Sequence, residues 1–521
     1  MQTVRKLRLL SPALALGALM LAGAGACGSS PAGSEGSKSG ADGGSSSGSG
    51  GSSGGTGGGS SGVGGDDGGA IFVSPLSDGA VTTSNVPRCI AATQQCVSAC
   101  TSGGETALSG TVYDPAGKNP LYGIVVYIPS EPVAPIATGA SCYSCNSLYT
   151  GNPIAYAVTD SAGKFTIHGV PDGANIPLVV QVGKWRMQYT LPSVTACQTS
   201  DPGALLKTKL TLPANHQVGD IPSIAIATGG ADSLECLLHR IGVDEAEYGP
   251  GPGSAGRIHI FYGDGGSNTS PAGPNAWSSL WDTQQDLMAY DITLLTCEGH
   301  EATSDGNSAA LTPAMRQALY DYAQNGGRVF ASHYHYNWFN AGPFGMQNLA
   351  TWQTGSQHYD TDPNAVILQT LPTGQPFPRG VAMHEWLTNV NALTNDELHI
   401  VQARHNALVT AANTASLPWI ETDTMADPPS QTEYFSFDTP FGTAPAEQCG
   451  RVVYSDLHVG AASGDYGGYT DNVPANSIVP TGCGNGDLSP QEKALEFMLF
   501  DLSGCITPPD QGAGGLPPPP K

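Results

Sequence analysis

Between residues 106 and 226, hydrophobic and polar residues alternate in short runs that turn sequences separate. Alternation with a period of two is typical of strands that bury one face. Asp-Pro-Ala-Gly at 114–117 and Asp-Ser-Ala-Gly at 160–163 are turn signals. The predicted strands span residues 108–113, 123–128, 154–158, 164–167, 176–182 and 185–189. We therefore expect an all-β domain over residues 106–226.

The pattern changes over residues 256–505, where strand-like hydrophobic runs alternate with helical ones. Thr312-Pro313 predicts the start of a helix, because Thr caps helices and Pro suits their first turn. The following Asn325-Gly326-Gly327 predicts its end. Strands are predicted at 257–262, 291–296, 328–332, 399–402, 433–437 and 451–455, and helices at 277–290, 315–324 and 490–502. Alternating strands and helices with short links indicate a mostly parallel sheet covered by helices.

The other segments have the composition of leaders, linkers and tails. Residues 1–26 combine basic residues, an apolar stretch and small residues, as an export signal does. Cys27 directly after the small residues resembles the processing site of a bacterial lipoprotein, so we expect its lipidation. The remaining assignments are a Gly/Ser-rich tether at 27–69, a cysteine-containing segment at 70–105, a connector at 227–255 and a Pro-rich disordered tail at 506–521.

The leader also predicts where the protein resides. A lipid on Cys27 would anchor it in a membrane, as an outer-membrane or cell-surface lipoprotein. Cleavage without lipidation would leave it periplasmic or extracellular. Both are compartments in which disulfides persist.

The twelve cysteines divide accordingly. If Cys27 is lipidated, an odd number remains, so one thiol has no partner within the chain. We expect Cys297 to be free, at the end of a predicted strand, and the other ten to form five disulfides. Cys142 and Cys145 are spaced like a redox or metal motif, but Cys197 in the same predicted domain favours a disulfide.

The net negative charge of the chain argues against nucleic acid as a partner. The formal net charge is −24 at pH 7. Such a chain repels phosphate backbones, so binding to nucleic acid is not expected.

Part of the β region resembles the carboxypeptidase regulatory-like domain. The similarity rests on residues 109–114, 123–127, 159–167 and 169–173. The resemblance implies a small immunoglobulin-like sandwich that supports folding or adhesion without catalysis.

The later region resembles the class I glutamine-amidotransferase-like fold, and especially its trehalose-utilisation (ThuA-like) branch. The similarity rests on residues 258–266, 290–295, 311–330 and 450–458, while residues 345–430 fit poorly and are expected to be an insertion. It implies a flavodoxin-like α/β domain. His458 stands where the family has its catalytic histidine, but His333 replaces the nucleophilic cysteine. Glutamine amidotransferase activity is therefore not expected.

Reactive side chains follow three of the predicted strands. In open α/β sheets ligands bind beyond the carboxyl ends of the strands, so these groups are expected at one rim. One interpretation is a hydrolase in which His333 or His458 activates Cys297, with Glu298 nearby. Another is a zinc or other divalent metal site. Its expected ligands are His333, His335 and His458, with Glu298 or Asp456 as the carboxylate.

A third interpretation concerns the aromatic residues at the same place. Tyr334, Tyr336 and Trp338 alternate with the histidines, and Trp352 and Trp386 follow. Aromatic faces beside carboxylates suit sugar rings, so these residues are candidates for stacking on a glycan. The alternative is that they pack in the core.

Two function classes therefore remain open. The first is an exported, lipid-anchored surface protein with a non-catalytic binding or scaffold role, related to carbohydrate. The second is a metal- or histidine-dependent hydrolase that acts on a glycan or small molecule. The first is favoured, because no complete catalytic set is visible.

Overall fold

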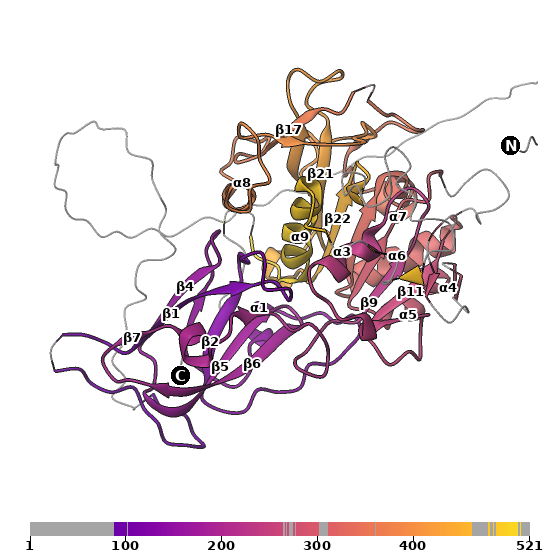
Figure 1. The fold of residues 1–521 in the computed structure, drawn as a ribbon. Helices are drawn as coiled ribbons and strands as arrows, with labels where there is room; N and C mark the ends of the chain where they lie inside the picture. The colour runs from indigo at the N-terminus through magenta and orange to yellow at the C-terminus, as the bar shows by residue number, and fades with distance from the viewer. Residues whose placement is uncertain are drawn as a thin grey trace, which may run out of the picture. The chain divides into compact units, whose positions relative to one another are not determined.

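The computed structural model describes residues 88–101, 103–263, 266, 268–269, 275–276, 278–301, 311–359, 361–460, 478–479, 483, 486–508 and 511 (Figure 1). The predicted export signal, Cys27, the tether and most of the Pro-rich tail lie outside these residues. Within the described residues, no helix combines the length and apolar character needed to cross a membrane.

We call the segment from β1 to β8, residues 107–211, the β part (Figure 1). It contains two four-stranded sheets. One has the order β4-β1-β7 with β8 also paired to β1, and the other has the order β3-β2-β5-β6. The elements are β1 Ala107–Tyr113, β2 Val125–Pro129, α1 Cys145–Leu148, β3 Pro153–Val158, β4 Lys164–His168, β5 Gly173–Val182, β6 Trp185–Val194, β7 Thr199–Ser200, α2 Pro202–Leu206 and β8 Leu210–Thr211. The six predicted strands are present, with ends shifted by a few residues.

Alternation along the strands explains the core of the β part. Leu108 and Val112 of β1 are fully buried, as are Val126 of β2 and Leu178 of β5, and all belong to one hydrophobic cluster. The turn before β4 requires glycine, because Gly163 has φ of +70° and an added Cβ would lie 2.8 Å from the Val112 carbonyl oxygen.

The second part is built on one large mixed sheet with the order β10-β11-β9-β14-β15-β22-β21-β20-β17-β18. Its strands are β9 Ile224–Ala227, β10 Tyr248–Gly249, β11 Ile258–Tyr262, β14 Ile292–Leu295, β15 Arg328–Ser332, β17 Asn364–Ile367, β18 Leu398–His399, β20 Ser416–Thr422, β21 Thr432–Thr439 and β22 Gly450–Ser455, with β13 Asn275–Ala276 paired to β11. The smaller ladders join β12 Asn268–Thr269 to β23 Ile478–Val479, and β16 Thr351–Trp352 to β19 Ala407–Leu408.

Half of the large sheet is parallel. Strands β11, β9, β14, β15 and β22 pair side by side in parallel. Numbered by their order in the chain, they run 2-1-3-4-5, which is the order of the flavodoxin-like doubly wound fold. The expected α/β architecture is therefore present in this half.

The other side of the sheet is antiparallel, so the sheet is mixed: among the described residues six of its ten pairings are parallel, as expected of a mostly parallel sheet, and four are antiparallel. β22, β21, β20, β17 and β18 are joined by antiparallel pairings. Only residues 423–431 link β20 to β21, and only 440–449 link β21 to β22. Such short links cannot carry a parallel crossover, which needs about a dozen residues or more. Much of the segment 345–430 thus extends the sheet.

The large sheet also begins earlier than the predicted boundary at residue 256. β9 lies between β11 and β14, although its residues were expected to end the β domain and begin the connector. Its Ile-Ala-Ile-Ala sequence is fully buried, as suits a central parallel strand. The expected connector also contains the helix α3, Leu234–Arg240.

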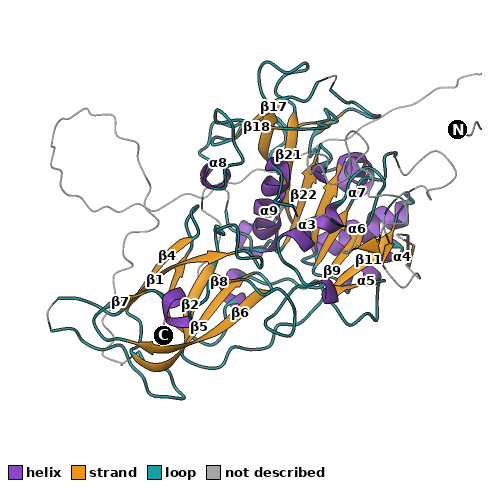
Figure 2. Ribbon diagram, in the orientation of Figure 1, coloured by secondary structure: helices purple, strands orange, loops and turns teal. Residues whose placement is uncertain are grey.

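Helices cover both faces of the large sheet (Figure 2). Ile224 and Ile226 of β9 face the cluster that includes α3 and α9, while Ala225 and Ala227 face the cluster that includes α6. The helices are α3 Leu234–Arg240, α4 Ser278–Trp281, α5 Gln284–Met288, α6 Pro313–Gln324, α7 Gly342–Gly345, α8 Pro378–Asn389 and α9 Pro490–Ser503, and the 3₁₀ turns are η1 Glu245–Glu247, η2 His333–Trp338 and η3 Pro445–Glu447.

The β part packs against α9. Tyr122 stacks on Phe497 with ring centroids 5.6 Å apart, and Trp185 meets Phe500 edge to face at 5.9 Å. The hydrophobic cluster of the β part continues through these contacts to one face of the large sheet. The two parts therefore share a core.

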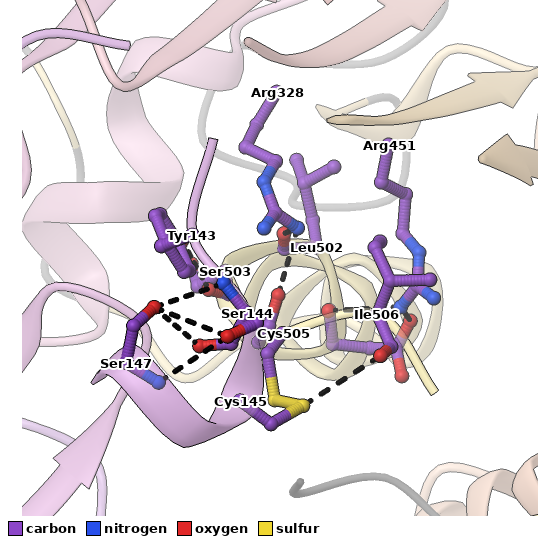
Figure 3. Close-up of a disulfide and its surroundings, with 12 residues drawn as sticks. Tyr143, Ser144, Cys145, Ser147, Arg328, Arg451, Leu502, Ser503, Cys505 and Ile506 are labelled. Atoms are coloured by element: carbon purple, nitrogen blue, oxygen red, sulfur yellow. Dashed lines mark hydrogen bonds and ion pairs between the residues drawn. A yellow bond between two sulfur atoms is a disulfide. The ribbon is translucent and has the colours of Figure 1, made fainter. Parts of the chain in front are cut away.

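Five disulfides join the described cysteines, and Cys297 is the free thiol among them. This confirms the expectation from the cysteine count. The pairs are Cys89–Cys96, Cys100–Cys197, Cys142–Cys449, Cys145–Cys505 and Cys236–Cys483. Cys142 and Cys145 thus link the β part to the second part rather than to Cys197. Figure 3 shows Cys145–Cys505 beside Arg328, which donates from Nη1 to the carbonyl oxygens of Leu502 and Gly504 at 2.7 Å.

Candidate functional site

The rim at the carboxyl ends of the parallel strands gathers the reactive residues. The order of these strands reverses between β9 and β14, which is where open α/β sheets bind their ligands. Cys297 lies just beyond β14, His333 directly follows β15, and His458 lies just beyond β22. We call these three residues the Cys-His-His cluster.

Within the Cys-His-His cluster, all three side chains are in contact. Cys297 Sγ lies 3.4 Å from His333 Nδ1, and His333 Nδ1 lies 3.0 Å from His458 Nε2. The donor atoms of all three lie within 4.8 Å of one another. Their residues are 0%, 1% and 5% exposed, so the cluster is buried.

The hydrogen bonds of the cluster define its protonation. His458 Nδ1 donates to the Gln402 amide oxygen at 2.6 Å, so the lone pair of His458 Nε2 faces His333. Burial lowers the pKa of His458 to about 3, and burial together with the charges of His458 and Arg404 lowers that of His333 well below its usual value. Both rings are therefore neutral at pH 7.

The thiol is protonated as well. Burial raises the pKa of Cys297 to about 12, and the charges of Glu298 and Asp232 act in the same direction. Gly299 N donates to Cys297 Sγ at 3.4 Å, which offsets this only in part. A thiol in this state is a poor nucleophile, because the reactive form is the thiolate.

His335 is turned away from the cluster. Residues 333–338 form the 3₁₀ turn η2, and His333 has φ of +43°, so the extended backbone that would aim both histidines one way is absent. His335 Nε2 donates to the Thr296 carbonyl oxygen at 2.9 Å, and its Nδ1 accepts from Trp338 at 3.1 Å. The expected ligand set of His333, His335 and His458 therefore does not converge in this structure; Cys297 takes the place of His335.

The two expected carboxylates also have other partners. Asp456 accepts from Ala407 N at 2.8 Å and from the Tyr454 hydroxyl at 2.9 Å, and burial raises its pKa to about 7. Glu298 lies 3.8 Å from His335 Nε2. Neither carboxylate belongs to the convergent group of donors.

Most of the candidate stacking residues lie in the core. Tyr336 and Trp338 are fully buried, and Trp386 is 1% exposed. Tyr334 and Trp352 are partly exposed. Core packing, the alternative weighed from the sequence, thus applies to Tyr336, Trp338 and Trp386.

Two residues that support the cluster were missed by sequence reasoning. Asp232 accepts hydrogen bonds from the backbone N–H groups of Ser233, Val459 and Gly460 at 2.8–3.0 Å, which fixes the chain just after His458. The apolar run of β9, followed by Thr-Gly-Gly-Ala-Asp, could have indicated that Asp232 lies just beyond the end of a strand. Gln402 orients His458 from the poorly matched segment, where the sequence carries no comparable signal.

Comparisons with known proteins add little. No family model and no curated protein match the sequence. Among solved structures, a ThuA-like protein from Parabacteroides merdae matches with 12% identity, covering 55% of this chain and 91% of its own, at a TM-score of 0.27. A cytoplasmic protein from Salmonella typhimurium matches with 11% identity, 41% and 78% coverage and a TM-score of 0.24. A cohesin–X-dockerin complex from Acetivibrio cellulolyticus matches with 18% identity, 29% and 78% coverage and a TM-score of 0.14. These TM-scores are all below 0.5, and no functional conclusion follows from them.

Proposed function

We propose that the protein is an exported, lipid-anchored surface protein with a non-catalytic binding or scaffold role. In this proposal the β part is an immunoglobulin-like sandwich of the carboxypeptidase regulatory-like type, and the second part is an amidotransferase-like (ThuA-like) domain without amidotransferase activity. Cys27 carries the lipid, and the Gly/Ser-rich tether at 27–69 holds the folded part away from the membrane. A glycan or small molecule is the expected ligand.

One observation carries the non-catalytic assignment. The Cys-His-His cluster fills the rim where an α/β enzyme would bind its substrate, and its three side chains are at most 5% exposed. A buried thiol with a pKa of about 12 is not prepared for nucleophilic attack. Five disulfides in one chain support an oxidising compartment.

The alternative is a histidine- or metal-dependent hydrolase. It is favoured by one contact, the 3.4 Å separation of Cys297 Sγ and His333 Nδ1, which allows proton transfer in the tautomer of His333 that carries its ring proton on Nε2.

Alkylation of the thiol discriminates between the two functions. Iodoacetamide should modify Cys297 in the folded protein at least about 100-fold more slowly than in the urea-unfolded protein, because a buried, protonated thiol does not react. Rapid, saturable modification of the folded protein at pH 7 would support the hydrolase.

Anchoring needs its own test. With Cys27→Ala, the protein should move from the membrane fraction to the soluble fraction and lose incorporation of labelled palmitate. Unchanged membrane association would contradict the lipid anchor.

A further inference from the structure

The Cys-His-His cluster has the composition of a metal site. A thiol and two imidazoles are the donors that zinc binds most often in proteins. They follow three different strands of one sheet, up to 161 positions apart in the chain, yet their donor atoms lie within 4.8 Å of one another. Among the described residues, no other group of three or more His, Cys, Asp or Glu side chains converges in this way.

Two of the three donor separations fit a single ion, and the third, between Cys297 Sγ and His458 Nε2, is at most 4.8 Å. With Zn–S of about 2.3 Å and Zn–N of about 2.0–2.1 Å, tetrahedral geometry places two nitrogens about 3.3 Å apart and a sulfur about 3.6 Å from a nitrogen. The observed separations are 3.0 Å between the two ring nitrogens and 3.4 Å between Cys297 Sγ and His333 Nδ1. Small outward shifts of the side chains would accommodate an ion between them.

The surroundings also support metal binding. Metal-bound histidines usually donate their other ring N–H to an oxygen, and His458 Nδ1 does so to Gln402 at 2.6 Å. The negative charges of Asp232 and Glu298 act on Cys297, and the positive charge of Arg404 acts on both histidines. A cation beside the thiol is therefore favoured by two carboxylates and opposed by one guanidinium.

We propose that Cys297 Sγ, His333 Nδ1 and His458 Nε2 bind one divalent transition-metal ion, and that zinc is the ion this mixed sulfur and nitrogen set fits best. On binding, the thiol proton passes to solvent and sulfur binds as thiolate. His333 moves its ring proton from Nδ1 to Nε2. No fourth His, Cys, Asp or Glu among the described residues joins the three, so the fourth tetrahedral position is left to water or a small anion.

Such a site would stabilise the fold by cross-linking three segments of the chain. The ion would tie together the chain just beyond β14, β15 and β22, where three parallel strands end. This effect does not depend on whether the protein binds a glycan, and the metal site can fail while the binding role stands.

Cobalt substitution tests the proposal directly. The protein, purified without a polyhistidine tag and with its disulfides intact, is stripped with chelator and titrated with Co²⁺. We expect one Co²⁺ per chain, visible absorption typical of tetrahedral cobalt, a near-ultraviolet sulfur-to-cobalt charge-transfer band, and displacement by one equivalent of Zn²⁺. Absence of stoichiometric binding would overturn the proposal.

Variants identify the ligands. Cys297→Ser should abolish the charge-transfer band, and survival of the band would place the cobalt elsewhere. Gln402→Ala, which leaves all three ligands in place, should weaken zinc binding about 10–100-fold. If His458→Ala, which removes a ligand, does not fold, Gln402→Ala still tests whether His458 takes part in binding the metal. His399→Ala, at an exposed position, is the matched control and should bind as the unmodified protein does.

Discussion

Cys145 of the β part is disulfide-bonded to Cys505, just after the last helix, across 360 positions of sequence. Cys142, three residues before it, is bonded to Cys449 across 307 positions. Together the two bonds attach one short segment of the β part to two separate places in the second part (Figure 3 shows the first). The two parts are therefore joined covalently as well as through their shared core.

Removing the bond between Cys145 and Cys505 should lower stability. Replacing both residues by Ser is expected to reduce the free energy of unfolding by about 2–4 kcal/mol, because the bond closes a long loop in the unfolded chain. Urea denaturation with the remaining disulfides oxidised measures the change.

The control is the bond between Cys89 and Cys96, which spans only seven positions. Its replacement by two Ser residues should cost less, since a short loop restricts the unfolded chain less. An equal or greater loss from the short loop would contradict the role of loop length. Removing both long-range bonds should cost more than the sum of the single losses, because each holds the same segment when the other is absent.

Glu496 of α9 should make stability depend on pH. It is fully buried, and burial together with the charge of Asp114 raises its pKa well above the usual value of 4.5. The unfolded chain releases this proton near pH 4.5 while the folded protein keeps it, so stability falls as pH rises above about 4.5. Glu496→Gln should make this fall shallower, leaving the part due to other buried carboxyls with raised pKa values such as Asp456, and should make the protein more stable than the unmodified one at pH 7 but not at pH 4.

Urea denaturation across pH 4 to 7 tests this. Asn119 Nδ2 donates to Glu496 at 2.6 Å, and a glutamine oxygen can accept the same bond. Glu245→Gln, at an exposed site, should leave the slope with pH unchanged. A variant at Glu496 that retains the slope of the unmodified protein would show that another group causes it.

Asp232 should hold the chain beside the Cys-His-His cluster. In Asp232→Ala, the buried backbone N–H groups of Ser233, Val459 and Gly460 lose their acceptor. Each unsatisfied buried donor costs about 1–3 kcal/mol, so the loss of unfolding free energy should be at least about 2 kcal/mol. Thermal denaturation measures it, with the exposed Asp282→Ala as control; a similar melting temperature for both variants would contradict this role.

Gly229 should tolerate no side chain. An added Cβ would collide with the carbonyl oxygen of Cys297, which comes close to the chain just after β9. Gly229→Ala should therefore give a strongly destabilised or insoluble protein. Gly104→Ala, whose Cβ would lie 3.7 Å from its nearest neighbour in ordinary contact, should be nearly neutral. Comparing soluble yield and melting temperature of the two variants decides the point.

Sequence periodicity was sufficient for most strands and for the helix at α6, because these elements bury regular patterns and carry clear caps. Thr312 accepts from Met315 N and Pro313 begins the helix, as its sequence indicates. The antiparallel half of the sheet was missed, because strand direction depends on which strands become neighbours, and residues 345–430 showed no clear pattern.

The candidate site could be predicted only in part. The positions of Cys297, His333 and His458 after strands indicated a common rim. The odd number of cysteines left beside Cys27 indicated one free thiol, and the place of Cys297 at a strand end made it the choice. The choice of His335 as a ligand rested on extended backbone, whereas the chain turns into η2 at His333. Gln402 comes from a distant loop, which local sequence cannot place.

The long-range disulfides also impose an order on biosynthesis. Cys142 and Cys145 are synthesised more than 300 residues before the cysteines that they bond in the finished protein. Until Cys449 and Cys505 have been synthesised, Cys142 and Cys145 have as nearest thiols each other and those of the segment 70–105. The native pattern can therefore be completed only after translation has reached the last helix, and any earlier pairing of Cys142 or Cys145 must be exchanged. Such an exchange requires a thiol–disulfide exchange system in the compartment where the protein folds.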